Sequence, residues 1–331
     1  MAKIVAAYIA QGRFREARRV TSRIAADLDP VLIRSWQRLY CLFRILKRYE
    51  NPDHETQFIL FTDHAPPHIG SCLIGRYLER LGVKIVQSDF YWRPDLQPER
   101  PDFFIFDTIE QLATRVAADD QILLFGPQAL VVHDVADLFG EIDRNGVLLV
   151  EASVGEVSEP LMDAYRAEIG LVRQEMKTPN LADSILAIDP HFLGLSGEKL
   201  ADVNRLLRRI FPKNELRAVR GEAFLSDPGE VLAAILAELG FHKSNLKGLT
   251  DEIAAMPDEF DVASLPDVPV IIPGYGREPD IVTLYETLRP DKFSAIHQDD
   301  TTAIARSTMR RRAFPPMPQR LMDWWSVHRS A

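Results

Sequence analysis

The feature that most constrains this chain is a short apolar run, residues 122–125, enclosed by polar and turn-forming residues. Two aspartates precede the run, and Gly126-Pro127 ends it abruptly. A continuous apolar segment of this length is typical of a strand buried on both faces, as in a parallel sheet. A second apolar run at 129–132 and a helix start at Asp134 follow. The chain is therefore predicted to fold around a buried central strand.

Strand and helix patterns alternate along the rest of the chain. Roughly the first 90 residues run strand, helix, strand, helix, strand, which is typical of a parallel sheet covered by helices. We therefore predict an α/β fold with a mixed, mostly parallel sheet flanked by helices, Rossmann-like in organisation. The predicted strands are residues 3–9, 56–62, 83–86, 122–125, 129–132, 146–150, 180–189 and 268–272. The predicted helices lie in residues 30–49, 69–81, 102–118, 134–139, 158–176, 195–210 and 231–239.

Composition limits the class of protein. With 331 residues and a net charge of −9, the chain can bury a large core and is not expected to bind nucleic acid through its general surface. Its two cysteines, Cys41 and Cys72, lie among apolar residues and imply no disulfide framework. No apolar stretch approaches twenty residues, so we expect no membrane span, and we interpret the N-terminus as a strand rather than a signal peptide. These features predict a cytoplasmic protein.

The order of elements around 121–139 resembles that of GT-A glycosyltransferases. In those enzymes a buried strand ends at a D-x-D motif, and a second apolar strand and a helix ending in Leu-Phe follow. Here the strand is present, the motif position holds Gly126-Pro127-Gln128, and Leu138-Phe139 closes the pattern. The resemblance covers roughly residues 3–300 and implies a GT-A-like fold that binds a nucleotide-sugar donor. Gly126 and Gln128 are accordingly candidate substrate contacts.

The usual metal of these enzymes lacks its ligands in this chain. Magnesium and manganese prefer hard oxygen ligands, usually carboxylates, whereas Gly126 has no side chain and Gln128 offers one neutral carbonyl. We therefore expect no metal and no other cofactor at this motif. A divalent cation elsewhere stays open, with Asp63, His64 and His68 as ligand types in one short loop. A simple polar turn is the alternative interpretation of that loop.

Candidate donor contacts follow the first two predicted strands. Tyr8, near the end of strand 3–9, is a candidate for stacking on a base, and Arg13 in the next loop for binding a phosphate. Asp63 follows strand 56–62 and would face the crevice in which open α/β sheets bind ligands. It is therefore a candidate base or ribose contact. The alternative for Arg13 is a solvated surface position.

Further candidates rest on the resemblance. Asp183 and Ser184 stand where GT-A enzymes carry an Asn-Ser-Gly segment near the donor sugar, and Lys292 and His297 stand in a late segment whose histidine contacts metal or diphosphate. Asp227 precedes a helix at a place where GT-A enzymes hold a carboxylate near the acceptor. A carboxylate there would act as the catalytic base that deprotonates an acceptor hydroxyl. An ordinary helix cap is the alternative interpretation of Asp227.

These features predict a glycosyltransferase that moves a sugar from a nucleotide-sugar donor to a hydroxyl of a glycan or small-molecule acceptor, without a D-x-D-bound metal. One alternative is a catalytically inactive GT-A-like binding or scaffolding protein in a glycan-assembly system. Another is an unrelated doubly wound α/β enzyme, although the chain has no G-x-S-x-G elbow and no G-x-G-x-x-G after its first strand. We predict a single domain over residues 1–300. The basic tail, 301–331, is predicted to pack on it and to be able to contact anionic lipid head groups.

Overall fold

The computed structural model describes a large part of the chain and leaves the rest outside the description. The described residues are 1–11, 30–48, 56–69, 72–91, 101–131, 135–151, 188–222, 224–225, 227–241, 270–271 and 278–288.

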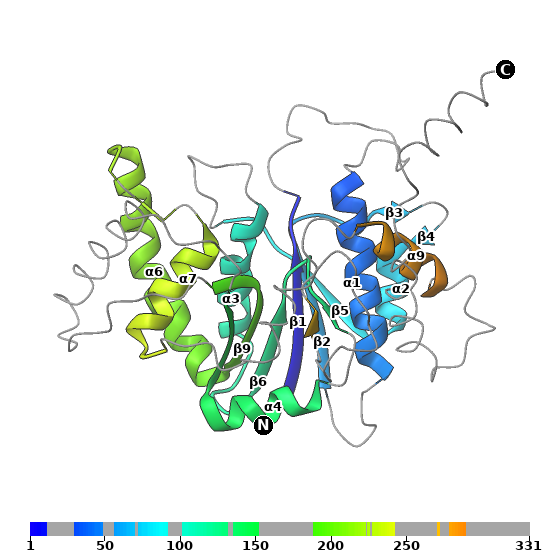
Figure 1. The fold of residues 1–331 in the computed structure, drawn as a ribbon, viewed down its shortest axis with the longest axis horizontal. Helices are drawn as coiled ribbons and strands as arrows, with labels where there is room; N and C mark the ends of the chain where they lie inside the picture. Colours follow the sequence, from blue (N-terminus) through cyan, green and yellow to red (C-terminus); the bar gives the residue numbers. More distant parts are fainter. Residues whose placement is uncertain are drawn as a thin grey trace, which may run out of the picture.

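A six-stranded sheet forms the centre of the described structure, with helices on both of its faces (Figure 1). Four neighbouring strands of the sheet run parallel to one another. The fifth strand pairs antiparallel with the fourth, and the sixth pairs antiparallel with the fifth. In spatial order the strands are β5 (Val83–Gln87), β2 (Thr56–Thr62), β1 (Lys3–Ile9), β6 (Gln121–Phe125), β9 (Ile188–Ser196) and β8 (Val147–Glu151). The predicted fold class, a mixed and mostly parallel sheet flanked by helices, is confirmed.

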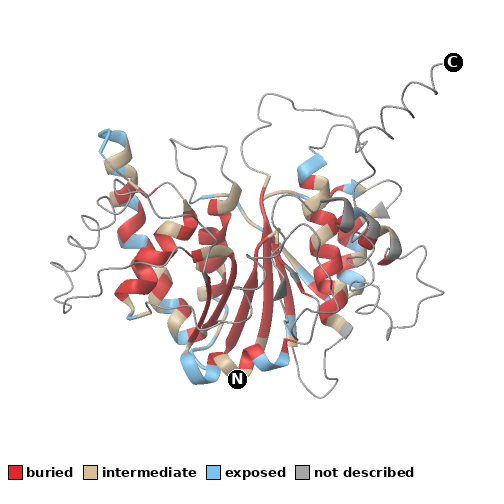
Figure 2. Cartoon of the chain, in the orientation of Figure 1, coloured by how far each residue is buried: buried red, intermediate tan, exposed pale blue. Residues whose placement is uncertain are grey.

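Strand β1 shows why the sheet is buried on both faces. Its side chains alternate between two hydrophobic cores: Val5 and Ala7 lie in one core, and Ala6 and Tyr8 in the other. Figure 2 shows the consequence, because the central strands and the inner sides of the covering helices are mostly buried. The continuous apolar run of β6 has the same cause, since all five of its residues are buried.

The helices divide between the two cores. One face of the sheet is covered by α1 (Pro30–Arg48), α2 (Ile74–Arg80) and α9 (Glu278–Leu288). The other is covered by the short 3-10 helix η2 (Pro101–Phe103), α3 (Phe104–Ala113), α6 (Gly197–Val219) and α7 (Pro228–Glu238). Helix α4 (Ala136–Asn145) lies at the edge of the sheet where β1 and β6 begin (Figure 1). Two small antiparallel pairs complete the description: β3 (His68–Ile69) with β4 (Cys72–Leu73), and β7 (Leu130–Val131) with β10 (Val270–Ile271).

Several predicted elements differ from the structure in where they begin or end. The helix expected to start at residue 69 starts at Ile74, because His68 and Ile69 pair with Leu73 and Cys72 in a hairpin first. The helix expected from residue 195 begins at Gly197, with Ser196 as its cap, because the preceding residues belong to β9. The strand predicted at 180–189 overlaps β9 only at its end, and residues 180–187 lie outside the described residues, as does the helix predicted at 158–176.

The strand order contains a switch point. From β1 the chain moves outward through β2 to β5, and it then returns to place β6 on the opposite side of β1. In open α/β sheets the crevice outside the carboxyl ends of the strands, where the order reverses, is the usual ligand site. The carboxyl ends of β1 and β6 define that place here, and β9, which is antiparallel to β6, begins at the same edge.

Candidate functional site

The turn that follows β6 lies at the switch point and packs directly against the start of β9. The amide of Gly126 donates a hydrogen bond of 2.7 Å to the carbonyl of His191. A Cβ at position 126 would lie 2.4 Å from Nδ1 of His191 and 2.9 Å from the hydroxyl oxygen of Tyr8. Position 126 therefore has no room for a side chain, because the imidazole of His191 and the hydroxyl of Tyr8 occupy that space.

His191 is a buried polar side chain within this cluster. Only 8% of the residue is exposed, and within the described part of the chain its Nδ1 has no hydrogen-bond partner. Its backbone amide donates to Oδ1 of Asp189 at 2.8 Å, which holds that carboxylate beside the start of β9. A buried polar atom without a partner is costly, so such atoms are uncommon except where a site uses them.

Tyr8 contributes its hydroxyl to the cluster rather than an open ring face. The residue is 1% exposed, and its hydroxyl donates to the carbonyl of Pro190 at 3.2 Å. Burial raises the pKa of Tyr8 well above its ordinary value, and the carboxylates of Asp102, Asp189 and Asp227 raise this pKa further. The hydroxyl is therefore a fixed neutral donor that lies close to acidic side chains. Its predicted substrate contact stays a prediction.

Asp227 reaches the same region from α7. Its Oδ1 accepts a 2.7 Å hydrogen bond from the amide of Gly229, and the side chain of Glu230 accepts from the amide of Asp227 at 3.2 Å. This is a capping box, so the alternative interpretation of Asp227 as a helix cap is correct. The cap and a role in the site are compatible, because the same carboxylate is near enough to the Tyr8 hydroxyl to raise its pKa. The catalytic role stays a prediction.

Local packing holds the start of α7 against the sheet. A Cβ at Gly229 would lie 2.2 Å from the carbonyl oxygen of Ile188, so only a glycine allows this approach of helix to strand. The side chain of Asn214 on α6 clamps Leu225 with two hydrogen bonds of 2.7 Å, one to its carbonyl and one from its amide. These contacts fix the segment that enters α7, and so they fix Asp227 relative to Asp189.

Asp63 lies at the end of β2 in a separate hydrogen-bond chain. Its Oδ1 accepts from the amide of Gln11 at 2.9 Å and from Nδ1 of His64 at 2.5 Å. The indole of Trp36 donates to Nε2 of His64 at 3.1 Å, which places the proton of the neutral imidazole on Nδ1. Asp63 thereby ties Gln11, two residues beyond the end of β1, to the end of β2. Both ring nitrogens of His64 are engaged by protein atoms, which disfavours the metal interpretation of this loop.

The described residues do not fit a divalent metal of the D-x-D kind. The turn at 126–128 presents a glycine, a proline and an amide, and none of these side chains is a carboxylate. Over the part of the chain that the structure describes, no group of three or more His, Cys, Asp or Glu side chains is arranged to hold a metal ion.

The structure brings three of the predicted residues together and leaves others outside its description. Tyr8, Gly126 and Asp227 lie in the cluster, and Gln128 is two residues beyond Gly126 in the same turn. Arg13, Asp183, Ser184, Lys292 and His297, together with the tail at 301–331, lie outside the described residues.

Two residues of the cluster, Asp189 and His191, were missed from sequence. The missed signal is the apolar run 192–195, which comes directly before the helix cap Ser196 and is typical of a buried strand. Asp189-Pro190 instead indicates a turn when it is judged by local sequence alone.

Among the described residues, no helix combines the length and the apolar composition that crossing a bilayer requires.

Known proteins similar to this chain were found by structure and not by sequence. No protein-family model matches the chain, and no curated protein matches it in sequence. One solved structure with a similar fold is apo mouse xyloside xylosyltransferase 1, at 10% identity and a TM-score of 0.41 over 72% of this chain and 82% of that one. Another is the galactosyltransferase LgtC in complex with donor and acceptor sugar analogues, at 12% identity and a TM-score of 0.45 over 98% of this chain and 99% of that one. An active-site mutant of LgtC matches at 12% identity and a TM-score of 0.41 over 93% and 96% of the two chains. At these identities the similarity concerns the fold alone.

Proposed function

We propose that this protein is a glycosyltransferase that moves a sugar from a nucleotide-sugar donor to a hydroxyl group of an acceptor. The observation that carries the proposal is the convergence of polar groups at the switch point of the sheet. The Tyr8 hydroxyl comes from β1, the His191 imidazole and the Asp189 carboxylate come from β9, and the Asp227 carboxylate comes from the start of α7; they meet there. A crevice at this place in an α/β sheet is suited to a nucleotide.

The acidic side of the cluster is suited to the sugar-transfer step. In transfer, the bond from the anomeric carbon to the diphosphate oxygen breaks and its electron pair leaves with the diphosphate. The acceptor oxygen bonds to the anomeric carbon, and its proton passes to a carboxylate. Asp227 is the proposed base. A second carboxylate nearby, Asp189, would stabilise positive charge that develops on the sugar ring in an oxocarbenium-like transition state.

The finer parts of the proposal concern the substrates and the setting. The donor is a nucleotide sugar, and the acceptor is a glycan or a small molecule, as in polysaccharide biosynthesis. We further propose that the protein acts in the cytoplasm, where the basic tail at 301–331 brings it to acceptors at an anionic membrane surface.

Product release from a donor panel tests the proposal. The full chain is incubated with nucleotide sugars of different base and sugar, with and without an acceptor mixture, and free nucleoside diphosphate is measured. We expect acceptor-dependent release for at least one donor. Asp227→Asn should lower the turnover by about 10²- to 10⁴-fold, because the general base is lost.

A matched control separates catalysis from capping. Ser196 caps α6 and accepts from the amide of Lys199 at 3.3 Å, at the opposite edge of the sheet where β9 pairs with the start of β6. Ser196→Ala removes a cap but no site residue, so its turnover should equal that of the unmodified protein. A folded protein that binds no nucleotide sugar or nucleoside diphosphate would refute the proposed function. Donor binding without any transfer would instead favour the inactive binding protein.

A further inference from the structure

An arginine lies against the turn at 126–128, and no acidic side chain of the described residues pairs with it. Nη1 of Arg38, on α1, is 3.4 Å from the carbonyl oxygen of Pro127, which is a long and weak hydrogen bond. Its Nε is buried and has no hydrogen-bond partner, and Arg38 forms no ion pair with any described residue. Among the described residues, the electrostatic neighbour that acts on Arg38 is Cys41, a neutral thiol one helical turn away.

This arrangement is unfavourable for an arginine that serves only the fold. The helix around it is closely packed, and its neighbours Gln37 and Leu39 are both buried. Burial lowers the pKa of Arg38, yet guanidinium groups stay protonated in proteins because their ordinary pKa is so high. A cation that has lost part of its hydration and gained no carboxylate is a net cost to stability. Such a residue is expected where a ligand supplies the missing negative charge.

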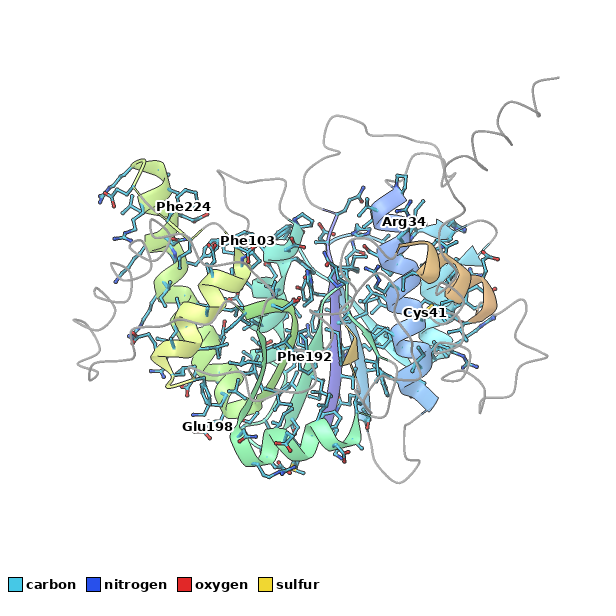
Figure 3. All side chains as sticks on the ribbon, in the orientation of Figure 1. Arg34, Cys41, Phe103, Phe192, Glu198 and Phe224 are labelled. Carbon is cyan, nitrogen blue, oxygen red and sulfur yellow. The ribbon has the colours of Figure 1, made fainter. Side chains whose placement is uncertain are left out.

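The position of Arg38 relates it to the switch point. Helix α1 runs antiparallel to β1, so its first half lies at the edge where β1 and β6 end (Figure 1). Figure 3 labels Arg34, about one turn before Arg38 on α1, and Cys41, about one turn after it. Arg34 is the nearer of these two to that edge. Arg38 reaches the turn from the α1 face of the sheet, whereas Tyr8 and the side chains around it lie on the α7 face. The turn therefore has a cation on one side and carboxylates on the other.

We propose that Arg38 is the anion-binding group of this site and that its guanidinium binds the diphosphate of a nucleotide directly. A diphosphate held through a metal would instead require carboxylates at this turn. The proposal rests on the proposed function and adds an orientation for the donor. The diphosphate lies toward α1, and the sugar lies toward Asp189 and Asp227. When the anomeric C–O bond breaks, the electron pair stays on the diphosphate oxygen, and the fork of Arg38 donors stabilises that charge.

Binding of two probes in the presence of EDTA tests the assignment. The full chain is titrated calorimetrically with nucleoside diphosphates and, separately, with inorganic pyrophosphate. Arg38→Gln should weaken both by roughly 10- to 100-fold, since hydrogen bonds to charged groups are involved. Arg38→Lys should lose less, because it keeps the charge but not the planar fork.

Arg44→Gln is the matched control. Arg44 lies on the same helix and is also half-buried, but it is about 9 Å further from the turn along the helix axis. Its affinity for both probes should match that of the unmodified protein.

The melting temperature distinguishes an arginine that binds a ligand from one that supports the fold, because replacement should change the Tm in opposite directions. Arg38→Met fills a similar volume and removes the uncompensated charge, so we expect an equal or higher Tm together with weaker pyrophosphate binding. A structural arginine would lower the Tm when it is replaced and leave the affinity unchanged.

The outcomes distinguish this inference from the proposed function. Sugar transfer with undiminished diphosphate affinity in Arg38→Gln would overturn the inference and leave the function intact. Pyrophosphate binding that depends on Arg38, in a protein that transfers no sugar, would support the anion site and refute the transferase. Binding that requires manganese, or no binding of either probe, would overturn the inference.

Discussion

At the scale of single residues, the site is defined by the fit between Gly126 and His191. In enzymes with a D-x-D turn a carboxylate projects from this position, whereas here the imidazole lies in the space that such a side chain would need. The absence of the acidic motif and the presence of a buried histidine on β9 are therefore two parts of one packing arrangement. A carboxylate could not be restored at position 126 without a change at position 191.

A double-mutant cycle tests this fit. Gly126→Ala should destabilise the protein by about 1–3 kcal/mol, because the new Cβ would overlap His191 and Tyr8. His191→Ala removes the imidazole contact at 2.4 Å but leaves the 2.8 Å approach of its Cα. The double variant should therefore recover part of that cost, which urea unfolding of the four proteins measures. Strict additivity would show that the two positions do not compete for space.

Residue types at this site were only partly predictable from sequence. Gly126 was identified because it ends an apolar run, but its close neighbour His191 is brought to it by the pairing of β6 with β9. Arg38 was equally hidden, since an arginine in an amphipathic helix ordinarily lies in solvent. Only the packing of α1 against β7 and the turn shows that Arg38 is half-buried and that, among the described residues, its Nε has no hydrogen-bond partner.

At the scale of elements, α7 shows how one side chain can serve the fold and the site together. Asp227 closes the capping box of α7, and the same carboxylate acts on Tyr8. The two roles predict different responses to two substitutions. Asparagine can accept the capping hydrogen bond but cannot act as a base, whereas alanine can do neither.

The free energy of unfolding and the turnover should therefore separate. Asp227→Ala should lose about 1 kcal/mol of stability, Asp227→Asn only a few tenths, and both should lose most of the transfer activity. Ser196→Ala, at the cap of α6, should lose a similar amount of stability and no activity. Chemical denaturation and nucleoside diphosphate release on the same preparations measure both effects. Full activity in Asp227→Asn would assign Asp227 to capping alone and leave Asp189 as the candidate base.

Elements with a strong local pattern were predicted well, and elements defined by pairing were not. The apolar runs of β1, β2 and β6 and the proline-started helix α1 agree with the structure within a residue or two at each end. The hairpin of β3 and β4 was missed because it has two-residue strands whose hydrogen bonds, rather than their sequence, define them. Strand β9 was misplaced because Asp189-Pro190 indicates a turn, yet here it lies at the start of a strand.

At the scale of the whole molecule, the sheet separates two hydrophobic cores that contain ionisable groups kept neutral by burial. Tyr40 and Cys41 lie in the core under α1, and Tyr8 lies in the core under α7. Burial raises the pKa of Tyr8 and Tyr40 above the ordinary 10.0, and that of Cys41 above the ordinary 9.0. Each of these groups becomes an anion when it loses its proton. Burial disfavours the anion, so each group resists ionisation in the folded state.

Alkaline pH should therefore destabilise the fold from both cores. A group whose pKa is raised on folding contributes its full stabilisation below its ordinary pKa, because both states then hold the proton. Above that pH the unfolded chain ionises while the folded chain does not, so the free energy of unfolding falls as pH rises. The decline should begin near pH 9 with Cys41 and steepen near pH 10 with the two tyrosines. Each such group contributes about 1.4 kcal/mol per pH unit once it is fully ionised in the unfolded state.

Urea unfolding between pH 7.5 and 10.5 measures this slope, and Cys41→Ala isolates the first part of it. The variant will be less stable at every pH because it leaves a small cavity, so the slope and not the stability is the informative quantity. Between pH 9 and 10 the variant should lose stability more slowly than the unmodified protein, since its unfolded chain has one ionising group fewer. Equal slopes would mean that the thiol ionises as readily in the folded protein as in the unfolded chain. The core under α1 would then have to admit water or a cation beside Cys41, and the packing around Arg38, one turn away on the same helix, would have to be reconsidered with it.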